Sequence, residues 1–223
     1  MTPKRFALIQ QILNQRQPDL TVVADGVHKP HNVSAILRTC DAVGVRRLYA
    51  VAAEGSLDRH HMIAGGSKRW VDLIVRPQIE DAYSELRTQG FEIVAAHGKP
   101  GALDFREFDF TRKVALVLGA ELTGPSQAAI EGADHCVQIP MHGMVESLNV
   151  SVAAAVILYE AQRQKAAAGH YQQRKIAEPE YSTTLFEWSH PDIAKRCRDA
   201  GLDYPSMTAE GDLAENPFIA RSD

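Results

Sequence analysis

The chain has 223 residues, of which 45% are hydrophobic and 23% charged, as in globular proteins and unlike disordered or fibrous ones. This length suits one large domain, alone or with appendages. The 24 Lys and Arg side chains against 28 Asp and Glu give a net charge of −4 at pH 7, which taken alone argues against a nucleic-acid partner.

Three widely spaced cysteines, Cys40, Cys136 and Cys197, form no Cys-x-x-Cys pair. We therefore expect reduced thiols and neither a disulfide framework nor a zinc knuckle. No cysteine or carboxylate lies at metal-ligand spacing from the histidines, so no metal is expected. The longest apolar run, residues 150–159, is half the length of a membrane span, and the N-terminus lacks a signal-peptide core. These features favour a soluble cytoplasmic protein without membrane contact.

The first predicted element is an amphipathic helix over residues 3–17, which Pro18 ends. From there, β-rich runs that are apolar on both faces alternate with helical patterns. The predicted strands are residues 20–24, 47–52, 71–75, 91–96, 114–118 and 136–139. The predicted helices between them are residues 32–43, 60–66, 78–89, 126–132 and 146–168. This alternation indicates an α/β fold with a mostly parallel sheet flanked by helices.

The segment from Glu178 onward differs in charge from the rest of the chain. Its ten acidic and four basic side chains give it a net charge of −6 and leave +2 on residues 1–177. Four prolines and one weak helical pattern, at residues 190–200, predict an extension that is partly ordered at best. The predicted organisation is an N-terminal helix (1–19), an α/β domain (20–169) and an acidic C-terminal extension (170–223).

Glycine-containing loops follow three of the predicted strands, at residues 97–101, 119–126 and 140–149. Ligands of parallel α/β sheets bind beyond the carboxyl ends of the strands, and glycine lets the backbone approach a ligand closely. Turn chemistry explains any one of these loops equally well, but three together favour a ligand site. Pro125-Ser126 stands where a phosphate loop needs Lys-Ser/Thr, and no G-x-G-x-x-G follows a strand, which argues against both common nucleotide motifs.

Residues 28–47 carry a net charge of +3 around the second predicted helix. Asn32 is typical of a helix N-cap. Helix-start amides together with the Arg38 guanidinium would suit a phosphate, although an exposed surface arginine explains Arg38 as well. Asn149 lies just inside the last helix of the α/β domain, for which Ser147 is the predicted cap. Its side chain needs a hydrogen-bond partner there, and a ligand would serve.

Three motifs in the chain together resemble a known family. The first runs over residues 31–44 (HNVSAILRTCDAVG), the second over 118–124 (LGAELTG) and the third over 139–153 (IPMHGMVESLNVSVA). In this order they resemble the TrmH/SpoU-type RNA ribose 2′-O-methyltransferases of the SPOUT class. The flanking residues 16–22 and 157–164 resemble the members that methylate guanosine 18 in the tRNA D loop.

The resemblance implies a SPOUT-type fold with a C-terminal trefoil knot, S-adenosyl-L-methionine as methyl donor, tRNA as substrate and a homodimer as the working form. The implied reaction is methylation of the ribose 2′-hydroxyl of guanosine 18. Two alternatives stay open: ribose methylation of ribosomal RNA, and a non-catalytic RNA-binding module on the same fold. Intact Asn32, Arg38, Glu121 and Asn149 argue against the non-catalytic module.

The resemblance also assigns roles to single residues. Arg38 would take the proton of the 2′-hydroxyl or clamp the neighbouring RNA phosphate, since a free guanidinium is a weak base. Asn32, Glu121 and Asn149 would order the site and the substrate. The residues expected to bind the cofactor are Ala96, His97, Gly119, Gly124, Ile139, Met141, Ser147 and Leu148. The residues expected to contact RNA phosphates are Lys4, Arg5, Arg16, Lys29, Arg163 and Lys165.

Overall fold

The computed structural model describes residues 1–52, 69–121, 123–215 and 218. These residues form two compact units: a sheet unit, Gln17–Tyr171, and a helical unit made of Met1–Arg16 and Gln172–Asp223. The predicted organisation treats the N-terminal helix and the C-terminal extension as separate appendages, whereas the structure groups them into one unit.

The sheet unit contains a seven-stranded sheet in the order β3-β2-β1-β6-β4-β7-β5, and every pairing in it is parallel. The strands are β1 (Leu20–Asp25), β2 (Arg47–Val51), β3 (Asp72–Arg76), β4 (Glu92–Ala96), β5 (Leu103–Asp104), β6 (Val114–Gly119) and β7 (His135–Gln138). All six predicted strands are confirmed, and with them the predicted fold class. The two-residue β5 is too short to leave a pattern in the sequence. The trefoil knot stays a prediction.

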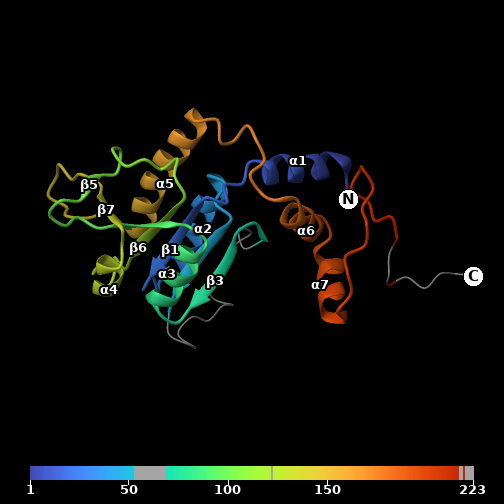
Figure 1. Cartoon of the computed structure of the whole chain (residues 1–223), viewed down its shortest axis with the longest axis horizontal. Coiled ribbons are helices and arrows are strands. Elements are labelled where there is room, and N and C mark those ends of the chain that lie inside the picture. The colour runs from blue at the N-terminus through green and yellow to red at the C-terminus, as the bar shows by residue number, and fades with distance from the viewer. Residues whose placement is uncertain (53–68, 122, 216–217, 219–223) are drawn as a thin grey trace, which may run out of the picture. The chain divides into compact units, whose positions relative to one another are not determined.

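Helices cover both faces of this sheet (Figure 1). One layer consists of α2 (Pro30–Ala42) and α5 (Val150–Ala167), and the other of α3 (Ile79–Thr88) and α4 (Gln127–Glu131). Successive strand residues point to opposite faces. Leu116 of β6 accordingly packs with α2 and α5, whereas its neighbour Val117 packs with α3 and α4. This two-sided burial explains why the central strands are continuously apolar.

Three predicted helices of the sheet unit, at residues 32–43, 78–89 and 126–132, are confirmed with small shifts in their bounds. The predicted helix at 60–66 lies outside the described residues. The last helix begins at Val150 rather than at residue 146, and its N-cap is Asn149 rather than Ser147. The Asn149 Oδ1 accepts a hydrogen bond from Ser151 N at 2.9 Å. The residues before Asn149 are therefore loop, and they are available to line a site.

The helical unit contains α1 (Pro3–Asn14), α6 (Glu178–Ser189) and α7 (Pro191–Ala200). The prediction of partial order at best is wrong for residues 178–189, which form α6, whereas the helix predicted at residues 190–200 is confirmed by α7. Tyr181, Phe186 and Trp188 of α6 are buried, and the Arg16 guanidinium lies 5.1 Å from the Trp188 ring centroid. The sequence pattern missed α6 because buried side chains surround much of this helix and include the polar Thr184 and Ser189. Among the described residues, no helix combines the length and apolar character needed to cross a membrane.

Candidate active site

The carboxyl ends of β1, β6, β4 and β7 line two adjoining cavities in the sheet unit. This is the edge of a parallel sheet at which ligands bind. The larger cavity has a volume of about 680 Å³ and the smaller about 430 Å³, both within the range of roughly 300–1,000 Å³ found for small-molecule sites. They share the lining residues Ala120, Glu121, Thr123 and Gly124. Ligands in the two cavities would therefore meet at the loop after β6.

The loop after β6 doubles back so tightly that its first residue has to be glycine. A Cβ on Gly119 would lie 1.8 Å from the carbonyl carbon of Gly124 and from Pro125 N. Gly124 closes the turn with a φ of +69°, a backbone conformation that disfavours other residues, and its N–H donates to Ala120 O at 2.8 Å. The glycine pair thus fixes the wall between the two cavities.

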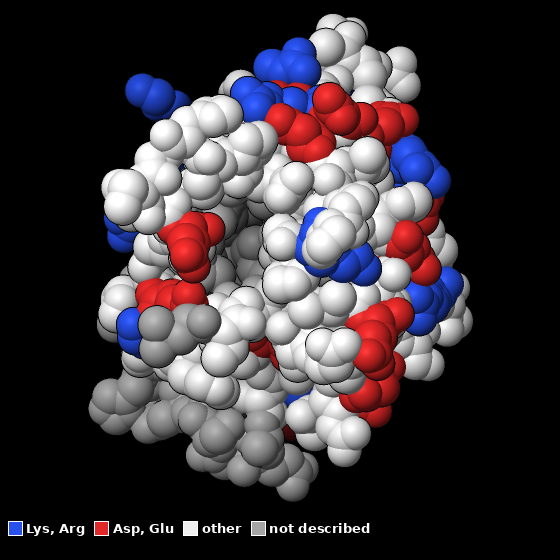
Figure 2. All heavy atoms as spheres, turned by 90° about the vertical axis from the view of Figure 1, so that its left-hand side faces the viewer, with Lys and Arg blue, Asp and Glu red and all other residues white. Residues whose placement is uncertain are grey.

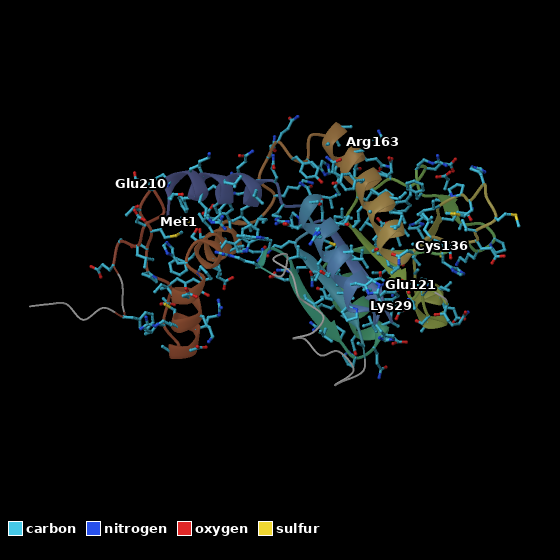
Figure 3. The ribbon with its side chains drawn as sticks, turned by 180° about the vertical axis from the view of Figure 1, so that it is seen from behind. Met1, Lys29, Glu121, Cys136, Arg163 and Glu210 are labelled. Carbon is cyan, nitrogen blue, oxygen red and sulfur yellow. The ribbon has the colours of Figure 1, made fainter. Side chains whose placement is uncertain are left out.

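Glu121 joins the first and third sequence motifs through its carboxylate. Its Oε1 accepts hydrogen bonds from Asn32 Nδ2 and from Asn149 Nδ2, the latter at 2.8 Å, and its Oε2 pairs with Lys29 Nζ. Asn149 Nδ2 also lies 3.3 Å from Asn32 Oδ1. Figure 3 shows Lys29 and Glu121 side by side. We call Lys29, Asn32, Glu121 and Asn149 the polar cluster.

Asn32 joins this cluster because it is not a helix cap. The helix α2 begins at Pro30, two residues earlier than predicted, and its N-cap is Lys29, whose side chain makes no capping bond. Asn32 therefore lies in the first turn, where its side chain is buried with 2% exposed and reaches Glu121. The N-cap prediction for Asn32 is wrong, whereas the prediction that Asn149 needs a polar partner is confirmed.

The charges in the polar cluster favour an ionised Glu121. The Lys29 ammonium, followed by the Asn32 amide, holds the pKa of the Glu121 carboxyl below its ordinary value. An ionised carboxylate can only accept hydrogen bonds. Glu121 therefore orients the amide groups of Asn32 and Asn149, leaving Asn32 Oδ1 turned toward Asn149 and the shared wall of the cavities.

All eight residues predicted to bind the cofactor line the larger cavity. They come from the ends of β4, β6 and β7 and from the loop before α5, segments far apart in the sequence. Other lining residues, among them Gln138, Glu146 and Val150, were not predicted to bind the cofactor. The available signal was their position, since Gln138 lies in the predicted strand 136–139 and the other two lie in the third motif.

Arg38 lines neither cavity. It is exposed on α2, six positions after Asn32, which places the two side chains about 120° apart around the helix axis. One copy of the chain therefore brings Asn32, Glu121 and Asn149 together and leaves Arg38 outside. The alternative interpretation of Arg38, as an exposed surface arginine, describes its position in the single chain correctly.

The six residues predicted to contact RNA fall into two groups. Lys4, Arg5, Lys29 and Arg163 are exposed. Arg163 pairs with Glu160 at 2.8 Å and lies at the far end of α5 from Lys29 (Figure 3). Lys165 and Arg16 are buried, with 0% and 1% exposed, and the Lys165 ammonium lies 3.1 Å from Asp19 Oδ1. The prediction of RNA contact is corrected for these two residues, because a buried side chain cannot reach a phosphate.

The face of the molecule that carries β5 and β7 is not uniformly basic. Figure 2 shows acidic side chains beside a hollow on this face and basic ones scattered around them. Among the described residues, no three His, Cys, Asp or Glu side chains gather as metal ligands would.

Sequence comparison places the chain among known proteins. Residues 19–159 match the SpoU rRNA Methylase family, and residues 163–216 match the C-terminal SpoU rRNA methylase family. The chain belongs to the SpoU methylase family. One relative, the tRNA (guanosine(18)-2′-O)-methyltransferase of Escherichia coli, is 46% identical over 96% of this chain and 94% of its own. The enzyme of the same name from Thermus thermophilus is 48% identical over 84% and 96%.

Solved structures of other SpoU methylases share the fold. The crystal structure of the Aquifex aeolicus TrmH/SpoU tRNA modifying enzyme matches with a TM-score of 0.77 and 42% identity, over 85% of this chain and 97% of that one. AviRb of Streptomyces viridochromogenes, solved in complex with the cofactor AdoMet, matches with a TM-score of 0.60 and 28% identity, over 69% and 62%. The SPOUT-type fold predicted for this SpoU methylase is thereby confirmed.

Proposed function

We propose that this chain transfers the methyl group of S-adenosyl-L-methionine to the ribose 2′-hydroxyl of guanosine 18 in tRNA. The observation that carries the proposal is the polar cluster at the junction of two cavities, one for a methyl donor and one for a nucleotide. The identity of 46% over 96% of the chain with a tRNA (guanosine(18)-2′-O)-methyltransferase supports the same substrate. A tRNA substrate supports the expected cytoplasmic location.

The larger cavity fits S-adenosyl-L-methionine. Its lining combines apolar side chains such as Leu118 and Ile157 with backbone at Gly119 and in the loop 139–148, the mixture of surface and hydrogen-bonding groups that a nucleoside with an amino-acid tail requires. Among the described residues that line it, the charged ones are carboxylates and none is Lys or Arg, which suits a cationic ligand. When bound, this cofactor supplies a methyl group on a sulfonium centre.

The chain's own residues would prepare the 2′-hydroxyl for attack. A hydroxyl must lose its proton as it becomes a nucleophile, and it must be held in line with the group it attacks. Asn32 and Asn149, fixed by Glu121, would orient the ribose. Arg38 would take the proton or bind the adjacent RNA phosphate, which would then assist.

We propose that Arg38 reaches this site from a second copy of the chain. Asn32 is buried beside Glu121, whereas Arg38 is exposed on a different side of α2 and lines neither cavity. The helix α5 leaves Val152 and Tyr159 47% and 54% exposed, two turns apart on one face. Exposed apolar surface of this kind suits burial against a partner, and a homodimer in which each copy supplies Arg38 to the other site satisfies both observations.

The test is transfer of a labelled methyl group from S-adenosyl-L-methionine to unmodified tRNA transcripts and to ribosomal RNA fragments, followed by mapping of the modified nucleotide. We expect label at guanosine 18 of tRNA. Label in ribosomal RNA alone would reassign the substrate. If neither RNA is labelled although S-adenosyl-L-methionine binds, the proposed activity is contradicted.

A further inference from the structure

The smaller cavity has its own acidic group at the carboxyl end of strand β1. Asp25 is buried, with 7% exposed, and lines this cavity but not the larger one. Its Oδ2 accepts a hydrogen bond from Ser126 N at 2.7 Å. Among the described residues, no other hydrogen bond to the Asp25 side chain is found. The other oxygen, Oδ1, can therefore accept a hydrogen bond from a ligand in this cavity.

The smaller cavity extends from this carboxylate to the polar cluster, at which the reacting ribose is proposed to lie. Asn32 and Glu121 of the polar cluster line the smaller cavity together with Asp25, and the larger cavity begins at the same Glu121. A nucleotide whose ribose lies at the polar cluster can thus extend its base toward Asp25 while its 2′-hydroxyl faces the larger cavity. Enzymes that act on one nucleotide commonly draw its base into a pocket of this kind.

We propose that the smaller cavity receives the guanine base of the target nucleotide and that Asp25 reads its Watson–Crick edge. Guanine presents two donors there, N1–H and the 2-amino group, and a carboxylate accepts both because each oxygen carries two lone pairs. Adenine presents an acceptor at N1, which the carboxylate repels. The proposal rests on the proposed function and adds to it the residue that distinguishes guanosine from adenosine.

The substitution Asp25→Asn tests this assignment while keeping the local structure. Its Oδ1 can still accept from Ser126 N, and its Nδ2 then places a donor in the cavity where the carboxylate offered acceptors. An amide pairs with adenine, which offers an acceptor at N1 and a donor at the 6-amino group. The variant should therefore lose activity on guanosine and lose less, or gain, on adenosine.

The measurement is the initial rate of methyl transfer to tRNA transcripts that carry guanosine, inosine or adenosine at position 18. The wild type should prefer guanosine over inosine, which lacks the 2-amino group, and inosine over adenosine. Asp25→Asn should reduce the ratio of the guanosine rate to the adenosine rate by about ten- to a hundredfold, the effect typical of a bidentate base contact. Binding of S-adenosyl-L-methionine, measured by calorimetry, should stay unchanged and shows that the variant is folded.

Asp134→Asn is the matched control. Asp134 also accepts a backbone hydrogen bond, from Ile93 N at 2.8 Å, but lines neither cavity, so its substitution should leave the order of the three rates unchanged. An unchanged guanosine-to-adenosine ratio in Asp25→Asn would overturn the base assignment and leave the proposed function intact. Equal wild-type rates on the three transcripts would also overturn the base assignment. This result does not depend on whether the variant folds. A wild type that methylates none of them would instead contradict the proposed function.

Discussion

At the scale of single residues, Glu121 is the point at which the hydrogen bonds of the site converge. Its carboxylate holds two amides, from Asn32 and Asn149, that belong to different motifs and to helices on opposite sides of the loop after β6 in the sequence. Lys29, whose side chain is 60% exposed, pairs with this carboxylate from the solvent side and offsets its charge. Because one carboxylate orders both amides, the geometry of the cluster depends on its ionisation.

We predict that Lys29→Met raises the pKa of Glu121, since the Lys29 ammonium is the largest cause of its lowering. A carboxyl whose pKa is lowered on folding contributes stability above its unfolded pKa of about 4.3, and this contribution is lost as the pH falls through the folded pKa. The melting temperature of the variant should therefore fall below that of the wild type at pH 7, by roughly 1–3 °C. The difference should shrink toward pH 3.

Melting curves between pH 3 and pH 7 provide the measurement. Lys29→Arg should behave like the wild type, because it keeps the positive charge. Lys99→Met removes an exposed lysine that lines neither cavity and should have no effect that depends on pH. A deficit of Lys29→Met that is the same at every pH would show that Lys29 acts through packing and not through the charge of Glu121.

At the scale of elements, the loop after β6 depends on the absence of a side chain at Gly119. Gly119→Ala would place a Cβ 1.8 Å from Gly124 C and Pro125 N, so the loop must move. We expect a loss of about 1–3 kcal/mol in the free energy of unfolding, the usual cost of overpacking. We also expect weaker binding of S-adenosyl-L-methionine, because the loop walls both cavities.

Chemical denaturation and calorimetry measure these two effects. Gly98→Ala is the control from the same cavity, because its Cβ would lie 3.5 Å from Gln138 Oε1, an ordinary contact. The contradicting result is that Gly119→Ala equals Gly98→Ala in both stability and affinity for S-adenosyl-L-methionine. That result would show that the loop moves without loss of folding free energy and that its shape does not determine the binding site.

The elements also show what the sequence could and could not reveal. Strands such as β6 were predictable because burial on both faces leaves a continuous apolar run. The eight residues expected to bind the cofactor were chosen from the resemblance of the motifs, and they share one cavity. The role of Asn32 as a buried partner of Glu121 was not, because a helix start at Pro30 or at Asn32 differs by two residues that local pattern cannot resolve. The helix α6 was missed because its burial comes from contacts distant in sequence.

At the scale of the whole molecule, the charge of −4 averages two different regions. The acidic residues after Glu178 belong to a unit with ordered helices, and the body of the chain carries +2. Two of the six basic residues expected to contact RNA, Arg16 and Lys165, are buried instead, and Lys165 pairs with Asp19 inside the sheet unit. Net charge alone argues against the nucleic-acid partner that we propose, so the proposal depends on the arrangement of the sites.

The homodimer proposal predicts complementation between two inactive variants. Asn32→Ala and Arg38→Ala should each abolish methyl transfer. If Arg38 acts in the partner's site, mixing them after exchange of subunits should restore about a quarter of the wild-type activity, because half of the dimers are mixed and each holds one complete site. A mixture as inactive as its components would place Arg38 and Asn32 in the same copy's site and contradict the proposal.

The most direct test of the proposed activity uses two tRNA transcripts that differ in one atom. One carries guanosine at position 18, and the other carries 2′-deoxyguanosine there. With labelled S-adenosyl-L-methionine, we expect one methyl group per molecule of the first transcript and none on the second. Equal labelling of both transcripts would contradict the proposed activity, since the methyl group would then reside on another nucleotide or another atom.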